Sequence, residues 1–164
     1  MKIRHTTAAD LDAVLQIYAE ARDFMSASGN PTQWKDWYPP REIIEHDIEV
    51  GTGHVCVDDE DNILAVFYFN IERDETYETI EDGEWLDGEP TAPCGVVHRI
   101  ASRAKGAGTF CIEWCFEQCG NLKIDTHEDN KPMQRVLEKL GFTYCGIIWV
   151  LDHTEPRIAF QRIR

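Results

Sequence analysis

The sequence predicts an α/β fold in one domain, residues 1–164, with the element order β-α-α-β-β-β-α-β-α-β-β. Segments rich in β-branched and aromatic residues indicate strands, and apolar residues at helical spacing indicate helices between several of them. A third observation is a strand-like run at 96–102, followed by a glycine-containing turn and then by a helix-like segment. A chain of this length is large enough for one domain with its own core.

The first half of the chain contains two predicted helices between a short strand and a hairpin. Thr7 and Asp10 have the spacing of a capping box, so they mark the start of the first helix. Pro39 and Pro40 can open the second helix, because proline fits the first helical turn. The elements in order are a strand at 2–5, a helix ending at about 24 or 25, a helix ending at 51, and hairpin strands at 54–57 and 63–71.

A long acidic segment, 72–93, separates this hairpin from the second half of the chain. A loop of this length in a compact domain is usually functional or mobile. The elements after it are the strand that ends near 102, a helix at 108–119, a strand at 122–126, a helix at 130–140, and strands at 144–151 and 157–163.

The turn 103–108 has the features of an anion-binding site. Arg103 and Lys105 supply positive charge, and Gly106 and Gly108 lack a Cβ, so a phosphate can approach the backbone closely. The helix that follows leaves N–H groups of its first turn without helical partners, and its dipole favours negative charge. The turn lacks the P-loop pattern and matches only part of a Rossmann loop. An ordinary turn before a helix is the alternative.

The pattern [R/Q]-x-x-G-x-[G/A] at 103–108 resembles the coenzyme A pyrophosphate loop of the GNAT family of N-acetyltransferases. The segments after it are also similar to this family: a strand, then Asn130 before an amphipathic helix, then Gly141-Phe142 at the end of that helix. The match covers residues 96–146, whereas the N-terminal part agrees in element order only. The resemblance implies a mixed central sheet with helices on both faces.

The resemblance also implies acetyl-CoA as co-substrate and direct transfer of its acetyl group to a primary amine of a small molecule or a protein. No metal is implied. The turn would hold the pyrophosphate, and the splayed end of the strand before it would pair with the pantetheine arm. Asn130 would contact the pantetheine, although asparagine also suits a helix N-cap. The implied cofactor-binding residues are Ile100, Ala101, Ser102, Arg103, Lys105, Gly106, Ala107, Gly108, Thr109 and Asn130.

His98 is the candidate general base, because a protonated amine must lose a proton before it attacks the thioester. A structural histidine is the other interpretation of this residue. The alternatives at the end of the neighbouring strand are Thr126, His127 and Glu128. Many members of the family carry a tyrosine, the general acid, at the position of Leu137. Tyr144 is the candidate acid in its place.

In the family, the loop after the first helix and the long acidic segment tend to line the acceptor side. Aromatic residues there would suit a cationic amine through cation–π contacts. A small additional core beneath the loops is the interpretation that we favour. These aromatic residues are Trp34, Trp37, Tyr38, Tyr77 and Trp85.

Acidic residues outnumber basic ones by 30 to 16, and the net charge is −14. This balance argues against a nucleic-acid partner, which requires a basic face. We expect a cytoplasmic protein without a membrane partner, since the sequence shows no signal peptide and no apolar run of membrane-spanning length. Cys111, Cys115 and Cys119 recur at every fourth position of one predicted helix, which favours a packed stripe over a metal site. A homodimer is expected by analogy alone.

Two alternative functions remain open. A non-catalytic acyl-CoA-binding or sensing module of the same fold is suggested by Leu137 at the position of the missing tyrosine. A nucleotide-binding domain could use the same turn, although Asn130 at its expected place argues against it.

Overall fold

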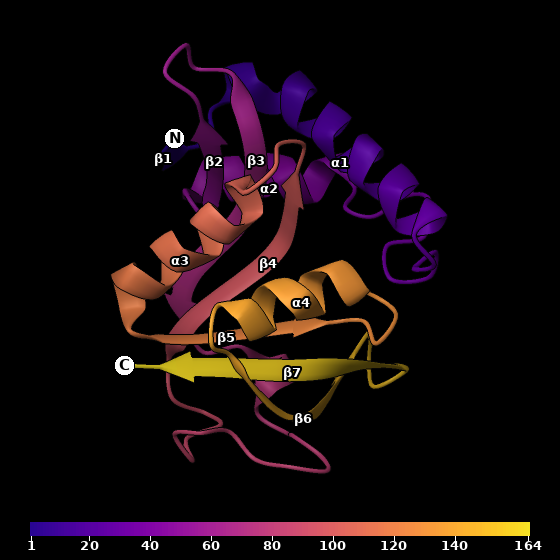
Figure 1. Cartoon of the computed structure of the whole chain (residues 1–164), viewed down its shortest axis with the longest axis vertical. Coiled ribbons are helices and arrows are strands. Elements are labelled where there is room, and N and C mark those ends of the chain that lie inside the picture. Colours follow the sequence, from indigo (N-terminus) through magenta and orange to yellow (C-terminus); the bar gives the residue numbers. More distant parts are fainter. The chain divides into compact units, whose positions relative to one another are not determined.

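The computed structural model describes residues 1–164, which form two compact units. The first unit comprises Met1–Phe69 and His98–Ile112, and the second comprises Asn70–Val97 and Glu113–Arg164. The element order is the predicted one (Figure 1). The elements are β1 (Lys2–His5), α1 (Leu11–Ala27), α2 (Arg41–Val50), β2 (Gly53–Val57), β3 (Ile63–Glu72), β4 (Cys94–Ser102), α3 (Ala107–Cys119), β5 (Asn121–Thr126), α4 (Lys131–Lys139), β6 (Thr143–Val150) and β7 (Glu155–Ile163), with 3₁₀ turns η1 (Ala8–Asp10) and η2 (Glu75–Tyr77).

The strands form a mixed sheet, as the sequence predicts. Neighbouring strands follow the order β1-β2-β3-β4 in the first unit and β4-β5-β7-β6 in the second, and β3 and β4 contribute residues to both units. The pair β4–β5 is parallel, whereas β7 pairs antiparallel with both β5 and β6. The last strand of the chain, yellow in Figure 1, therefore lies between two strands that precede it.

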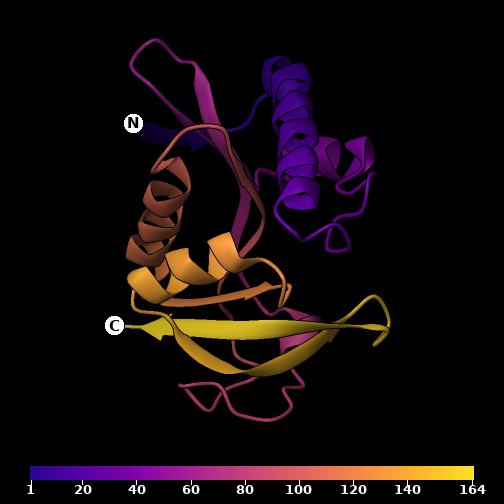
Figure 2. The ribbon, with the colours of Figure 1, turned by 45° about the vertical axis from the view of Figure 1, so that its right-hand side comes forward.

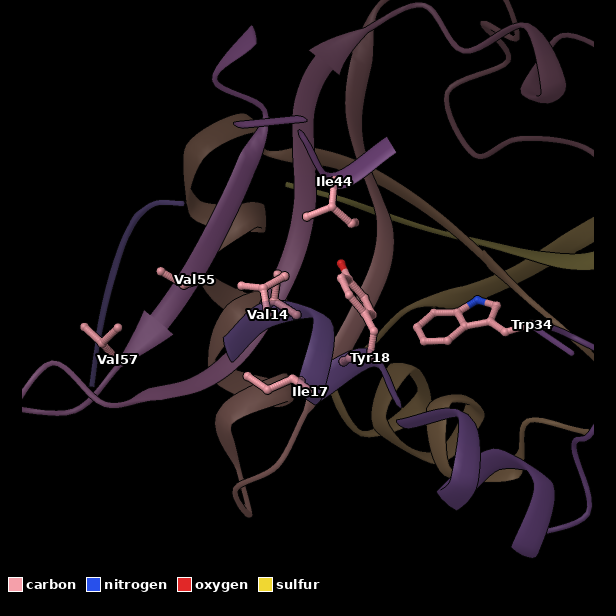
Figure 3. Close-up of a cluster of buried hydrophobic side chains, with 9 residues drawn as sticks. Val14, Ile17, Tyr18, Trp34, Ile44, Val55 and Val57 are labelled. Atoms are coloured by element: carbon pink, nitrogen blue, oxygen red, sulfur yellow. The ribbon is translucent and has the colours of Figure 1, made fainter. Parts of the chain in front are cut away.

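The core of the first unit lies between α1, α2 and one face of its strands (Figure 3). It contains Val14, Ile17, Tyr18, Trp34, Ile44, Val55, Val57, Val66 and Ala101. Because side chains alternate along a strand, Cys56 points to the opposite face of β2 from Val55 and Val57. There its thiol hydrogen-bonds with Cys111 of α3. Helices thus cover both faces of the first unit's strands, as expected.

Local sequence signals explain where the first two helices begin. The capping box of Thr7 and Asp10 is present, and it opens the turn η1, which leads into α1. The second helix starts one residue later than Pro39-Pro40 suggests, because Pro40 is extended and serves as the N-cap of α2. Gly51 ends this helix in the left-handed conformation, which glycine adopts without strain.

The acidic segment between β3 and β4 packs against the strands of the second unit. Tyr77 is 1% exposed and donates a hydrogen bond to Asp125 of β5, with an O–O distance of 2.7 Å. Trp85, 3% exposed, donates to the carbonyl of Tyr77. Both aromatic residues are therefore core residues, which confirms the favoured interpretation for these two positions.

A buried lysine fixes this segment further. Lys123 of β5 is fully buried, and its Nζ donates to the carbonyl of Glu89 and lies 3.6 Å from Asp87. The same Nζ lies 4.6 Å from the centre of the Trp85 ring. A buried cation is costly unless it is paired, so these contacts hold the acidic segment against β5.

The second unit also contains α4, which lies along β5 in both views (Figures 1 and 2). Leu137 of this helix is fully buried. On α3, Cys111 and Cys115 are fully buried and Cys119 is half-buried, so the cysteines pack as a stripe that is buried at its first two positions. Burial raises the pKa of the Cys115 thiol, so it stays protonated at neutral pH. None of the helices combines the length and apolar character needed to cross a membrane.

Candidate functional site

The turn between β4 and α3 is short and leads directly into the helix. β4 ends at Ser102 and α3 begins at Ala107, one residue earlier than predicted. The N–H of Ala107 donates to the carbonyl of Ala104, and that of Phe110 donates to the carbonyl of Gly106. The N–H groups of Gly108 and Thr109 lie in the first helical turn, where no helical carbonyl precedes them. These two groups are available to an anion.

Both glycines of the turn leave open space beside the backbone. Gly106 has a φ of +82°, a left-handed conformation that favours glycine, and a Cβ there would meet no atom within 4 Å. A Cβ on Gly108 would meet only the Cβ of Ser102, at 3.8 Å, which is an ordinary contact. Packing therefore does not require glycine at position 108. The open surface beside both residues fits a phosphate group.

The two cations of the turn differ in their surroundings. Arg103 forms an ion pair with Glu20 of α1 at 2.8 Å, and its backbone N–H donates to the carbonyl of Leu64. Lys105 is exposed and forms no ion pair. The sequence did not reveal Glu20 as a partner, because the pair joins residues 83 positions apart. Lys105 is the cation most available to a phosphate.

The strand before the turn bends at a residue that the sequence analysis did not single out. Arg99 has a φ of +52°, which is rare for a residue with a Cβ. Its carbonyl accepts a hydrogen bond of 2.8 Å from the hydroxyl of Tyr18. Its guanidinium donates to both carboxylate oxygens of Asp47 at 2.9 and 2.8 Å. Burial is the main influence on Asp47 and raises its pKa, while Arg99 lowers it.

A sequence signal for this ion pair does exist. Asp47 lies among Ile43, Ile44 and Ile48, the apolar residues predicted to carry the second helix. An acid on an apolar helix face is buried when the helix packs, and a buried carboxylate requires a partner. The helical pattern predicts that such a partner exists, although it does not identify Arg99.

His98, the candidate base, lies beside this bend. It is half-buried, and its ring centre lies 5.6 Å from that of Tyr68 on β3. His98 belongs to the first unit, together with the strand end Ile100–Ser102 and the turn as far as Thr109. Asn130 and Tyr144 belong to the second unit.

Asn130 is the N-cap of α4, as one of its two interpretations predicts. Its Oδ1 accepts a hydrogen bond of 3.2 Å from the N–H of Met133. A contact with pantetheine stays a prediction. Tyr144 lies on β6, is 50% exposed, and packs edge-on against Phe160. Its role as an acid likewise stays a prediction.

The remaining candidates lie at the end of β5, in the turn after it and on α4. Thr126 is buried, and its Oγ1 has no hydrogen-bond partner. His127 accepts a hydrogen bond at Nδ1 from the N–H of Asp129, and Glu128 accepts one at its carbonyl from Gln134. Leu137 of α4, at the position of the family's tyrosine, is buried in the core.

A surface hollow of about 460 Å³ lies at the end of α1 and the loop that follows it. It is lined by both acidic and basic side chains. The lining residues are Ala19, Arg22, Asp23, Ser26, Pro31, Lys35 and Asp36. Trp37 in the same loop is 53% exposed, whereas Trp34 belongs to the core. No group of histidine, cysteine, aspartate or glutamate side chains is arranged to hold a metal ion.

Comparison with known proteins supports one family. The family model described as an acetyltransferase (GNAT) domain matches residues 1–143. An acetyltransferase of the GNAT family from Streptococcus agalactiae has a similar structure, with 30% identity, a TM-score of 0.87, and coverage of 99% of this chain and 95% of that chain. Among curated proteins, none matches this sequence.

Two more distant structures share the fold. A ribosomal-protein-alanine N-acetyltransferase from Brucella melitensis is 17% identical, with a TM-score of 0.64 and coverage of 100% of both chains. A phosphinothricin acetyltransferase from Sinorhizobium meliloti, solved in complex with AcCoA, is 16% identical, with a TM-score of 0.62 and coverage of 98% of this chain and 86% of that chain.

Proposed function

The chain belongs to the GNAT family of acetyltransferases, and on this premise we propose that it transfers the acetyl group of acetyl-CoA directly to a primary amine. The observation that carries this proposal is the turn before α3. There, N–H groups without helical partners, an exposed lysine and two glycines with open space beside them occur together. These are the requirements for binding a pyrophosphate.

The residues of the first unit would divide the work of binding. The N–H groups of Gly108 and Thr109 would bind the pyrophosphate, with Lys105 as the nearest free cation. Arg103 would share its charge between Glu20 and the phosphate. The strand end Ile100–Ser102 would pair with the pantetheine arm. A backbone N–H at this strand end would stabilise the oxyanion that forms when the amine attacks the thioester.

Proton transfer would complete the reaction. The acceptor amine carries a proton at neutral pH, and His98 would take it, directly or through a water molecule. Tyr144 would donate a proton to the departing thiolate. The acceptor is a small-molecule amine or a protein amino group. The hollow at the end of α1 carries Asp23 and Asp36 together with Arg22 and Lys35, so its charge selects no class of acceptor.

A non-catalytic acyl-CoA-binding module is the second candidate. The observation that favours it is Leu137, which is buried at the position where many family members carry the tyrosine. Such a module would bind acetyl-CoA in the same way and would release no CoA in the presence of amines.

Release of free CoA from acetyl-CoA, measured with a panel of polyamines, aminoglycosides and lysine-containing peptides, tests the proposal. We expect release with at least one acceptor and its loss in His98→Ala with acetyl-CoA affinity retained. General-base catalysis contributes about 10²–10⁴-fold, so the loss should be of that order. Binding of acetyl-CoA without release for any acceptor would support the non-catalytic module.

A further inference from the structure

The bend of β4 at Arg99 requires support from the surrounding fold. A residue with a Cβ is disfavoured in the left-handed conformation, and Arg99 adopts it with a φ of +52° in the middle of a strand. Glycine would adopt this conformation without strain, but the chain has arginine here. The contacts of the arginine side chain and backbone must therefore favour the bend.

Three elements hold this residue at once. From α1, the hydroxyl of Tyr18 donates to the Arg99 carbonyl at 2.8 Å, and Tyr18 is itself 1% exposed in the core. From α2, Asp47 accepts two hydrogen bonds from the guanidinium, and the side chains of Arg99 and Asp47 are only 12% and 7% exposed. From β3, the ring of Tyr68 lies 4.7 Å from the guanidinium carbon.

The ion pair matters more for geometry than for net stability. Burial of two charges costs free energy that their attraction only about repays, so a buried pair is weak evidence for stabilisation. Nη2 of Arg99 does, however, donate to both carboxylate oxygens of Asp47, which holds this end of the guanidinium beside α2. Together with the Tyr18 hydrogen bond, this pair fixes both ends of Arg99, side chain and carbonyl.

The bend directs the segment that would bind the cofactor arm. Ile100, Ala101 and Ser102 follow Arg99 directly, and the Arg103 N–H is then held by the carbonyl of Leu64. We propose that Tyr18, Asp47 and Arg99 are positioning residues, which hold β4 bent so that residues 100–102 present their backbone to the pantetheine arm of acetyl-CoA. This inference rests on the proposed function.

Two variants that differ only in a Cβ test this role. Arg99→Ala and Arg99→Gly are made in an Asp47→Asn background, so neither leaves a buried carboxylate without its cation. Calorimetric titration then measures binding of acetyl-CoA and of 3′-phospho-ADP, the part of CoA that lacks pantetheine. We expect the glycine variant to bind acetyl-CoA about tenfold more tightly than the alanine variant, because only alanine disfavours the bend. Binding of 3′-phospho-ADP should be equal in both.

Tyr18→Phe provides a second test in a protein with the ion pair intact. It removes one hydroxyl and should weaken binding of acetyl-CoA while leaving 3′-phospho-ADP binding unchanged. The control is Arg41→Ala, which removes the exposed Arg41–Glu45 pair from α2, the helix that carries Asp47, and should change neither affinity.

Specific outcomes would overturn the role. The role is overturned if Arg99→Gly binds acetyl-CoA no more tightly than Arg99→Ala. It is also overturned if Tyr18→Phe weakens the binding of both ligands equally, because a purely structural defect gives that result. Wild-type protein that binds neither ligand would instead overturn the proposed function, and this role with it.

Discussion

Arg4 and its two carboxylate partners illustrate how single residues stabilise the start of the chain. The guanidinium donates to Asp10 at 2.7 and 3.0 Å and also contacts Asp61. Asp10 additionally accepts hydrogen bonds from the N–H and the hydroxyl of Thr7. The hydrogen bonds from Arg4, together with those from Thr7, lower the pKa of Asp10 from 3.8 to about 2, against the effect of burial.

This lowered pKa predicts a pH dependence of folding. Because the folded-state pKa lies below the ordinary value of 3.8, Asp10 stabilises the fold above that pH, and its contribution is lost as the pH falls towards 2. We expect Asp10→Asn to lower the free energy of unfolding by about 1–2 kcal/mol at pH 7. Urea denaturation of the variant and wild type at pH 7 and pH 2.5 checks this. An equal difference at both pH values would contradict it.

At the residue scale, the sequence predicted the groups whose role is local. The capping box of Thr7 and Asp10, the N-cap Asn130 and the glycines of the turn depend on neighbours within a few positions. The left-handed Arg99 was not predicted, because its conformation depends on Tyr18 and Asp47, 81 and 52 positions away.

At the scale of elements, substitutions at the start of α3 can separate effects on folding stability from effects on ligand affinity. Gly108 lies in the first turn of the helix, where alanine is favoured over glycine, and the protein has room for a Cβ there. We therefore expect Gly108→Ala to raise the free energy of unfolding by up to about 1 kcal/mol, and so to keep or raise the melting temperature. Because the family pattern at 103–108 admits alanine at position 108, this change should leave acetyl-CoA binding nearly unchanged. Lys105→Ala, by contrast, should weaken binding without loss of stability, because Lys105 is exposed and lies beside the N–H groups that would hold the pyrophosphate.

Thermal unfolding without ligand and calorimetric titration with acetyl-CoA check both halves of this prediction. Gln118→Ala, an exposed change near the end of the same helix, is the control and should leave affinity unchanged. If Lys105→Ala binds acetyl-CoA as tightly as wild type, that result would contradict pyrophosphate binding at this turn.

Helices and strands followed their local patterns, with shifts of one to a few residues at their ends. The length of the acidic segment suggested a functional or mobile loop. The structure packs its Tyr77 and Trp85 into the second unit, which agrees with the small core favoured for these aromatic residues. In β5, Leu122 and Ile124 alternate with Lys123 and Asp125, which by pattern alone predicts an exposed polar face. That face is instead covered, because Lys123 finds its partners in a segment more than thirty positions earlier, Asp87 and Glu89.

At the scale of the whole molecule, the element order could be predicted because it is a sum of local patterns. The insertion of β7 between β5 and β6 could not be read from these patterns, since strand partners are chosen by long-range packing. Of the candidate site, the turn and His98 were predicted from the sequence and stay predictions, and the fold added Glu20 beside Arg103 and the supports of Arg99. These additions are all contacts between distant segments.

Thermal unfolding with acetyl-CoA, CoA, ATP and NAD added separately is the most direct test of the acetyl-CoA site. A ligand at about 100 times its dissociation constant stabilises a protein by about 2.7 kcal/mol, which corresponds to a rise of several degrees in melting temperature. We predict this rise with acetyl-CoA and CoA and none with ATP or NAD. No rise with either CoA species would show that the turn before α3 is only a turn, and it would contradict the proposed acetyltransferase activity.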